Sequence, residues 1–176
     1  GAANVEWGRN RNIDGIPGLM VEGEYEWWEA RVRPALAFRM MYPESCISFL
    51  CDTGRSHFDC GDRTADYIAK FIEKSLQQRL NEDGTLRKLN PKDGYLAERF
   101  HSDMIGTDGA DKGKAPEAAS TSRPAPAPYA MYKGDKHDAF WYFDKEMAQL
   151  TEARYKETAG KQVQYVGFEY QGKLIP

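Results

Sequence analysis

The stretch "FLCDTGRSHFDCGDRTADYIAKFI", residues 49–72, contains the strongest structural signals of this chain. An apolar run ends in it, a polar loop with His57 follows, and apolar residues then recur at helical spacing. This order predicts a buried strand, a loop and an amphipathic helix over residues 62–80, with Asp62 as its N-cap. The expected buried face of this helix consists of Ala65, Ile68, Ala69, Ile72, Leu76 and Leu80.

A similar unit precedes this stretch. "PGLMVEG", residues 17–23, is a short apolar run that predicts a first buried strand, and "SCISFLC", residues 45–51, predicts the second. Between them, Pro34 suits the first position of a helix that continues to Met41. Strands that are apolar on both faces belong to parallel sheets covered by helices, so we expect an α/β fold with flanking helices.

The remainder of the chain differs in character. Residues 81–129 are turn-rich, and "RPAPAP" near their end is typical of a loop or linker. Apolar spacing predicts a second long helix over residues 138–156, and the alternation in "VGFEY" predicts a half-buried strand after it. We therefore expect an α/β core, a linker-rich segment and an irregular α+β accessory tail, at residues 1–80, 81–129 and 130–176.

Composition excludes several classes of function. The chain has 176 residues, of which 41% are hydrophobic and 29% charged, as in a soluble globular domain. Its net charge of -3 and scattered basic residues do not favour a nucleic-acid partner. No apolar run approaches the roughly 20 residues that span a bilayer. None of the three cysteines is spaced with histidines as in zinc sites, so we expect no metal site and no cofactor.

The cysteines allow two other roles. Cys51 and Cys60 flank the loop of His57, and a disulfide between them would hold this loop; free buried thiols are the alternative. Cys51 also lies at a predicted strand end, but it lacks the preceding glycine and following helix that a nucleophilic thiol at an elbow would have. Cys46 leaves an odd cysteine, so the compartment stays open, with a secreted or periplasmic protein favoured over a cytoplasmic one.

Acidic side chains and the histidine follow the two predicted strands. Glu24 and Glu26 come after the first strand, and His57 comes after the second. In open α/β sheets, functional groups gather at the carboxyl ends of the strands. A carboxylate that accepts the imidazole N–H holds one tautomer and stabilises the imidazolium. We therefore expect one of these glutamates to support His57 as a general base, although a loop histidine bonded to a backbone carbonyl is the simpler alternative.

Together, "PGLMVEGEYE", a helix, a second strand, "GRSHFD" and a long helix resemble the C-terminal part of the α/β-hydrolase fold, over residues 13–80. In that family a strand of the form Pro-x-Leu-x-x-x-Gly-x-x-acid delivers the triad acid, and the histidine follows one strand later. Alignment on Gly23 implies Glu26 as this acid, with Glu24 and Glu22 as alternatives. The resemblance implies a serine-type carboxylic ester hydrolase that acts on a small ester, with His57 as its base.

The nucleophile of that family has no counterpart here. It lies on a G-x-S-x-G elbow, and no serine of this chain has those flanks; Ser56 comes nearest but lacks the second glycine. The glycine-rich oxyanion loop is absent as well. Both elements precede the acid in the family, so the resemblance implies an upstream segment or a second polypeptide that carries the serine, and a chain that is inactive alone. A non-catalytic binding module derived from a hydrolase fold is the alternative.

Other distinctive residues have simpler interpretations beside the functional ones. Trp27 and Trp28 follow the candidate acid and either line a substrate pocket or pack against the sheet. His101 and His137 have polar neighbours and no spaced ligands, so we expect both in solvent. The aromatic run "AFWYFDKEMA" predicts core packing rather than a cofactor site.

Overall fold

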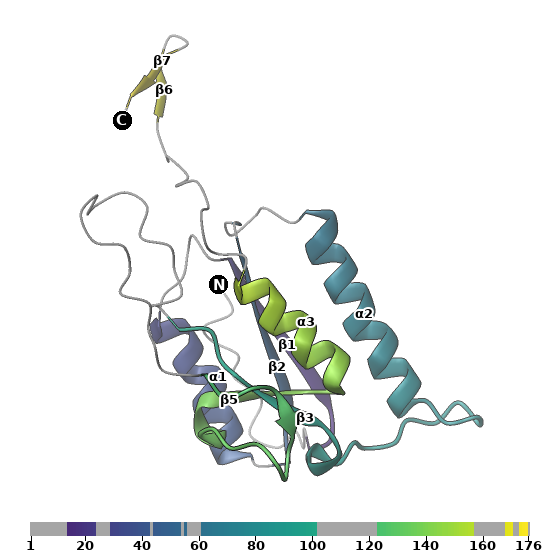
Figure 1. Ribbon diagram of the computed structural model, residues 1–176. Helices are drawn as coiled ribbons and strands as arrows, with labels where there is room; N and C mark the ends of the chain where they lie inside the picture. The colour runs from purple at the N-terminus through teal and green to yellow at the C-terminus, as the bar shows by residue number, and fades with distance from the viewer. Residues whose placement is uncertain are drawn as a thin grey trace.

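The computed structural model describes residues 14–23, 29–42, 44–53, 55, 61–101, 123–156, 168–170 and 173–175. In this part of the chain the fold is mixed α/β, with three α-helices, a two-stranded parallel sheet, a three-stranded antiparallel sheet and a short antiparallel pair (Figure 1). The helices are α1 (Glu29–Met41), α2 (Asp62–Arg79) and α3 (Lys145–Lys156), with 3-10 turns η2 (Pro91–Asp93) and η4 (Lys136–Asp138). The strands are β1 (Pro17–Gly23), β2 (Cys46–Asp52), β3 (Tyr95–Glu98), β4 (Ala127–Pro128), β5 (Ala139–Tyr142), β6 (Phe168–Tyr170) and β7 (Lys173–Ile175).

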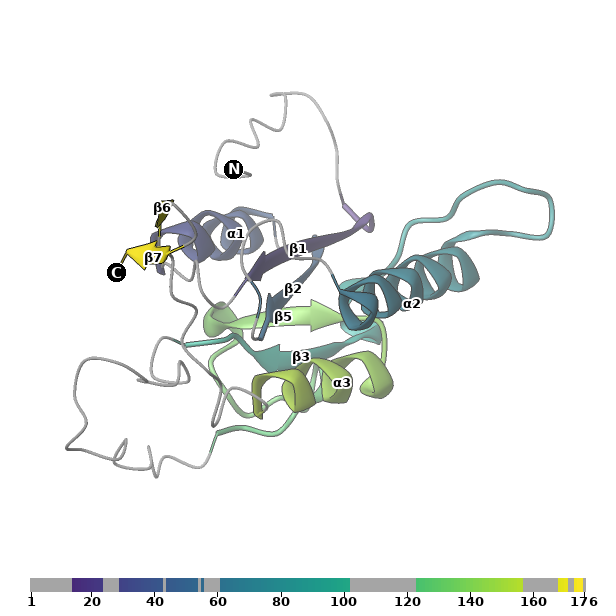
Figure 2. The same ribbon diagram turned by 90° about the horizontal axis from the view of Figure 1, so that it is seen from above.

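Strands β1 and β2 form the parallel pair, in register from Pro17 opposite Cys46 to Gly23 opposite Asp52. Helix α1 connects them, as a parallel crossover requires. Both strands and their parallel pairing confirm the expectation from the sequence. Strand β2 is buried along almost its whole length, whereas β1 is only half-buried at most positions. Figure 2 shows α1 on one side of the pair and α3 on the other.

Helix α1 begins before the position that the sequence predicts. It starts at Glu29, so Pro34 lies inside the helix and not at its first position. A proline inside a helix removes one backbone hydrogen bond, which must be offset by packing. Val32, in the turn before the proline, is fully buried in the core and provides such packing.

Helix α2 has the predicted bounds, but its buried face is not the predicted one. Its buried side chains are Thr64, Tyr67 and Phe71. The predicted apolar face instead lies largely in solvent, with Ile72, Leu76 and Leu80 exposed by 53%, 52% and 48%. Its aromatic side chains therefore point into the core, and its aliphatic side chains form an outer stripe.

The N-cap of α2 is also one residue earlier than predicted. Gly61 occupies it, and its carbonyl accepts hydrogen bonds from the backbone N–H groups of Thr64 and Ala65. Asp62 lies in the first turn, where its charge suits the positive end of the helix dipole.

The antiparallel sheet has the order β4-β3-β5. Strand β5 and the short strand β3 lie in segments predicted to be helix and linker, so the helix over 138–156 is wrong in its first part. All four side chains of β5 are buried, and aromatic residues favour a strand that packs on both faces. Helix α3 begins only after Asp144, whose carboxylate accepts a hydrogen bond of 3.0 Å from the N–H of Met147.

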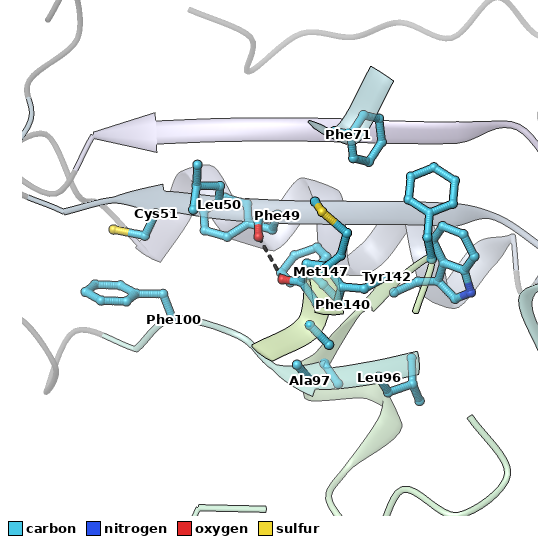
Figure 3. Packing of buried hydrophobic residues seen from close by; sticks show 14 of the residues in the cluster. Phe49, Leu50, Cys51, Phe71, Leu96, Ala97, Phe100, Phe140, Tyr142 and Met147 are labelled. Carbon is cyan, nitrogen blue, oxygen red and sulfur yellow. Dashed lines mark hydrogen bonds between the residues drawn. The ribbon is translucent and has the colours of Figure 1, made fainter. Parts of the chain in front are cut away.

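Side chains join the two sheets where β2 and β5 lie next to each other. The Tyr142 hydroxyl donates to the Phe49 carbonyl over 2.7 Å (Figure 3). The Tyr155 hydroxyl donates to the same carbonyl over 3.2 Å, and Ser48 Oγ donates to the Trp141 carbonyl over 2.5 Å. A single hydrophobic cluster extends across this junction and includes residues of β2, α2, β3, β5 and α3. Residues of β5 and α3, which belong to the predicted accessory tail, are therefore part of the same core as the parallel pair.

Two further features complete the fold. Strand β6 contains Phe168 and Tyr170 of the predicted C-terminal strand and pairs with β7, while Val166 lies outside the described residues. None of the described helices combines the length and apolar character needed to cross a lipid bilayer.

Candidate functional site

The carboxyl ends of β1 and β2 are neighbours. Gly23 and Asp52, the last residues of the two strands, are paired in the parallel register. The segments that follow these two residues therefore start side by side, at the edge where α/β folds collect functional groups. The residues on which the predicted triad, pocket and disulfide depend lie outside the described part of the chain: Glu24, Glu26, Trp27, Trp28, His57 and Cys60.

Asp52 is a buried carboxylate at this edge, and two side chains contact it. The Thr64 hydroxyl of α2 donates a hydrogen bond to it, and the Arg154 guanidinium of α3 lies 3.5 Å away. Arg154 also donates to the backbone carbonyl of Arg63, in the first turn of α2. This carboxylate is thus used to join β2, α2 and α3, and we do not assign it a role in proton transfer.

Glu22 is the second buried carboxylate of this edge, and it is the one alternative acid that the structure describes. It precedes Gly23 in β1 and lies opposite Cys51 in the register. Its side chain is only 4% exposed, which is rare for a glutamate without a specific role. Glu22 is therefore held at the end of β1, next to the segment that carries Glu24 and Glu26.

Arg55 connects the start of the histidine loop to helix α2. A Cβ atom added to Gly61 would lie 2.5 Å from Nη2 of Arg55, so the guanidinium packs directly over the glycine. Any larger residue at the N-cap of α2 would displace it. Gly61, at the N-cap of α2, thus provides space for the Arg55 side chain.

The two described cysteines are both fully buried. Burial raises the pKa of the Cys46 thiol to about 12, which suits a structural residue and not a nucleophile. Cys51 is also fully buried, whereas reactive thiols are partly exposed to solvent. The disulfide between Cys51 and Cys60 stays a prediction.

A second polar cluster lies at the ends of β3 and η4, and the sequence did not predict it. His101 Nε2 is 3.1 Å from Asp138 Oδ2 and 3.7 Å from Glu98 Oε1. The other oxygen of each carboxylate faces an arginine: Arg99 Nε is 2.5 Å from Asp138 Oδ1, and Arg123 Nη1 is 3.0 Å from Glu98 Oε2. We name Glu98, His101 and Asp138 the β3–η4 cluster.

His101 is therefore not the solvent-exposed residue that the sequence predicts. Its side chain is half-buried, because the cluster and the strand ends enclose it. His137 does match the prediction: it is exposed and lies 3.2 Å from Asp135, its neighbour in the same turn. The sequence offers no signal for the β3–η4 cluster, since its histidine and Asp138 come from segments on either side of residues 102–122.

Tyr132 adds a polar group close to this cluster. Its side chain is only 6% exposed, and its hydroxyl makes no hydrogen bond with the described residues. Burial is the main cause that raises the pKa of Tyr132, and the charges of Glu98 and Asp138 raise it further. A buried hydroxyl without a hydrogen-bond partner lowers the stability of the folded state, so the position of the Tyr132 hydroxyl requires an explanation.

The comparisons with known proteins do not identify the chain: no protein-family model, no curated protein and no solved structure matches it.

Proposed function

We propose that this chain is the acid- and histidine-bearing part of a serine-type hydrolase that cleaves carboxylic esters. The observation that carries the proposal is the parallel register that pairs Gly23 with Asp52. Glu26 follows Gly23 by three positions and His57 follows Asp52 by five, so both residues belong to segments that leave adjacent points of one sheet edge. A carboxylate and an imidazole need this proximity to act as a pair.

The order of the elements supports the same assignment. The chain runs from β1 through α1 to β2 and then, after the loop of His57, into the long helix α2. The acid thus comes before the histidine and one strand away from it, as in the α/β-hydrolase family that the sequence resembles.

The neighbouring carboxylates limit the choice of the acid. Asp52 contacts Thr64 and Arg154, and these contacts hold its charge inside the core. The acid is then a residue at or just after the end of β1. We assign it to Glu26, with Glu24 and the buried Glu22 as the alternatives to be separated by experiment.

In the proposed reaction His57 removes the proton from a serine hydroxyl as the serine oxygen attacks the ester carbonyl. The leaving alcohol takes this proton from His57, and a covalent serine ester remains. Water then attacks this ester with His57 again as the base, which releases the acid product and restores the serine. Glu26 orients the imidazole and stabilises its charged form.

The serine comes from another segment, and β1 and α2 provide surfaces for it. Among the described residues β1 has a hydrogen-bonded strand on one side only, so its other edge is available for a further strand. The aliphatic stripe of α2, with Ile72, Leu76 and Leu80, is exposed. A polypeptide that adds a strand to β1 and covers this stripe would extend the sheet and bury both surfaces.

Labelling with a fluorophosphonate, which modifies activated serines, tests the proposal. We expect the protein purified from its native source to contain a labelled serine in a G-x-S-x-G peptide, on an upstream segment or on a second chain that native mass spectrometry detects. His57→Ala should lower ester hydrolysis by about 10⁴-fold or more, and His137→Ala should leave it unchanged. Glu22→Gln, Glu24→Gln and Glu26→Gln then identify the acid, because only the variant of the true acid loses activity.

Two results would contradict the proposal. One is a folded monomer of this chain alone that hydrolyses no ester and whose native form retains no partner. The other is hydrolysis that survives His57→Ala. A partner that lacks an activated serine would instead favour the non-catalytic interaction module, which uses the same exposed stripe.

A further inference from the structure

The β3–η4 cluster brings three ligand atoms to one point. Nε2 of His101 and one oxygen each from Glu98 and Asp138 all lie within 4.8 Å of one another. Donors about 2.1 Å from a common tetrahedral ion lie about 3.4 Å apart. The distances from His101 Nε2 to the two oxygens, 3.1 and 3.7 Å, are on either side of this value. The two distances that involve the imidazole therefore suit a small cation bound between it and the carboxylates.

The His101 imidazole is not satisfied by hydrogen bonds within the cluster. His101 Nε2 is buried and makes no hydrogen bond with the described residues, although a carboxylate oxygen is close to it. The Tyr132 hydroxyl, in the same electrostatic environment, is likewise buried without a hydrogen bond to the described residues. An imidazole nitrogen, two carboxylate oxygens and a phenol oxygen are all able to donate electron pairs to a metal ion.

The carboxylates of Asp138 and Glu98 each also form an ion pair with an arginine. Arg99 binds the oxygen of Asp138 that faces away from His101, and Arg123 does the same for Glu98. Metal-binding carboxylates commonly have such outer partners, which orient the ligand atoms. The two positive charges also offset those of the carboxylates, so the expected affinity is moderate and below that of closed cysteine sites.

We propose that Glu98, His101 and Asp138 bind a divalent transition-metal ion, and that Zn²⁺ is the ion that this set of ligands fits best. A mixed set of imidazole and carboxylate ligands favours Zn²⁺ over Mg²⁺ or Ca²⁺, which prefer oxygen ligands alone. A water molecule would fill the fourth position of a tetrahedral ion.

The ion would have a structural role. His101 immediately precedes residues 102–122 and Arg123 immediately follows them, while Asp138 ends η4 just before β5. A metal ion bound here would link the segment after the end of β3 to the residue before the start of β5. This role is independent of the proposed ester hydrolysis, and its test needs no esterase activity.

Zinc binding by the purified 176-residue chain tests the proposal. After removal of metals with a chelator, calorimetry should show one Zn²⁺ bound per chain, and His101→Ala should weaken binding by about tenfold or more. His137→Ala is the matched control, because His137 also lies beside an aspartate but is exposed and has only that carboxylate; its Zn²⁺ affinity should not change.

Two further measurements distinguish a loss of Zn²⁺ binding from a loss of folding. Asp138→Asn keeps the size of the side chain and should weaken Zn²⁺ binding while the circular dichroism spectrum stays that of the wild type. In the wild-type protein, the NMR signal of the His101 imidazole should shift on addition of Zn²⁺, and that of His137 should not. A failure of the chain to bind Zn²⁺ stoichiometrically, or equal binding by wild type and both cluster variants, would overturn the proposal and leave a polar network without a bound ion.

Discussion

Arg154, on helix α3, places its guanidinium 3.5 Å from the carboxylate of Asp52 at the end of strand β2. Both side chains are almost completely buried, and they are 102 positions apart in the chain. The contact binds the C-terminal helix to the strand edge from which the histidine loop departs. Helix α3 thereby contributes to holding that edge in place.

Removal of Arg154 should strongly destabilise the protein. Arg154→Met would leave Asp52 buried with its charge uncompensated, and such a change typically costs about 3–5 kcal/mol. The free energy of unfolding from urea titration measures it. The double variant Asp52→Asn/Arg154→Met should recover much of the loss, because no buried charge remains.

Lys70→Met is the control for this prediction. Lys70 pairs with Glu146 and, like Arg154, connects α2 to α3, but both side chains of this pair are partly exposed. Solvent screens exposed ion pairs, so this variant should change the free energy of unfolding very little. Equal losses for the two variants would mean that the contact of Asp52 with Arg154 has no special energetic role.

The two tyrosines that bind the Phe49 carbonyl should act together. Tyr142→Phe and Tyr155→Phe each remove one hydroxyl donor, and each should cost about 1 kcal/mol, because the other hydroxyl remains. The double variant removes both donors from a buried carbonyl and should cost more than the sum of the single changes. Urea unfolding of the three variants checks this; strict additivity would argue against a shared acceptor.

The two faces of α2 should respond differently to truncation. Phe71 is buried against Phe143, with their ring centroids 5.1 Å apart, so Phe71→Ala should cost about 3–5 kcal/mol. Leu76 is exposed, and Leu76→Ala should change the free energy of unfolding of the isolated chain by less than about 0.5 kcal/mol. If a partner covers the stripe as proposed, Leu76→Glu should reduce the retention of that partner. A large loss of stability for Leu76→Ala in the isolated chain would contradict the observed orientation of the helix.

Alkaline pH should unfold the protein through its buried tyrosines. Burial is the main cause that raises the pKa of Tyr67 from 10.0 to about 12. A group whose pKa is higher in the folded state contributes its full stability below the unfolded pKa, and this contribution is lost as pH rises from about 10 to about 12. Phenolate absorbance and circular dichroism, followed together across this range, should change in one step. Tyr67→Phe should weaken the pH dependence; a phenolate signal from Tyr67 before any unfolding would contradict the assignment.

The sequence predicted the parts of the fold that depend on local patterns. The parallel strands β1 and β2 and the extent of α2 follow from short apolar runs and helical spacing, which neighbouring residues determine. The same patterns failed where tertiary packing overrides them. Phe140 and Phe143 extend the helical spacing of Met147 and Leu150, but Phe140 belongs to strand β5, because β3 pairs with this strand and β2 packs beside it.

Which face of a helix is buried depends on the elements that lie next to it, and a single helix sequence does not determine this. Helix α2 has an aromatic side and an aliphatic side, and the position of Phe143 places the aromatic side in the core. The β3–η4 cluster arises in the same way, because His101 and Asp138 meet only when β3 pairs with β5. Local patterns were thus enough to predict β1, α1, β2 and α2 in their order, and with them the segments after the two strands that carry Glu26 and His57. Which side chains meet could not be predicted in this way, since contacts between distant segments depend on how the whole chain packs.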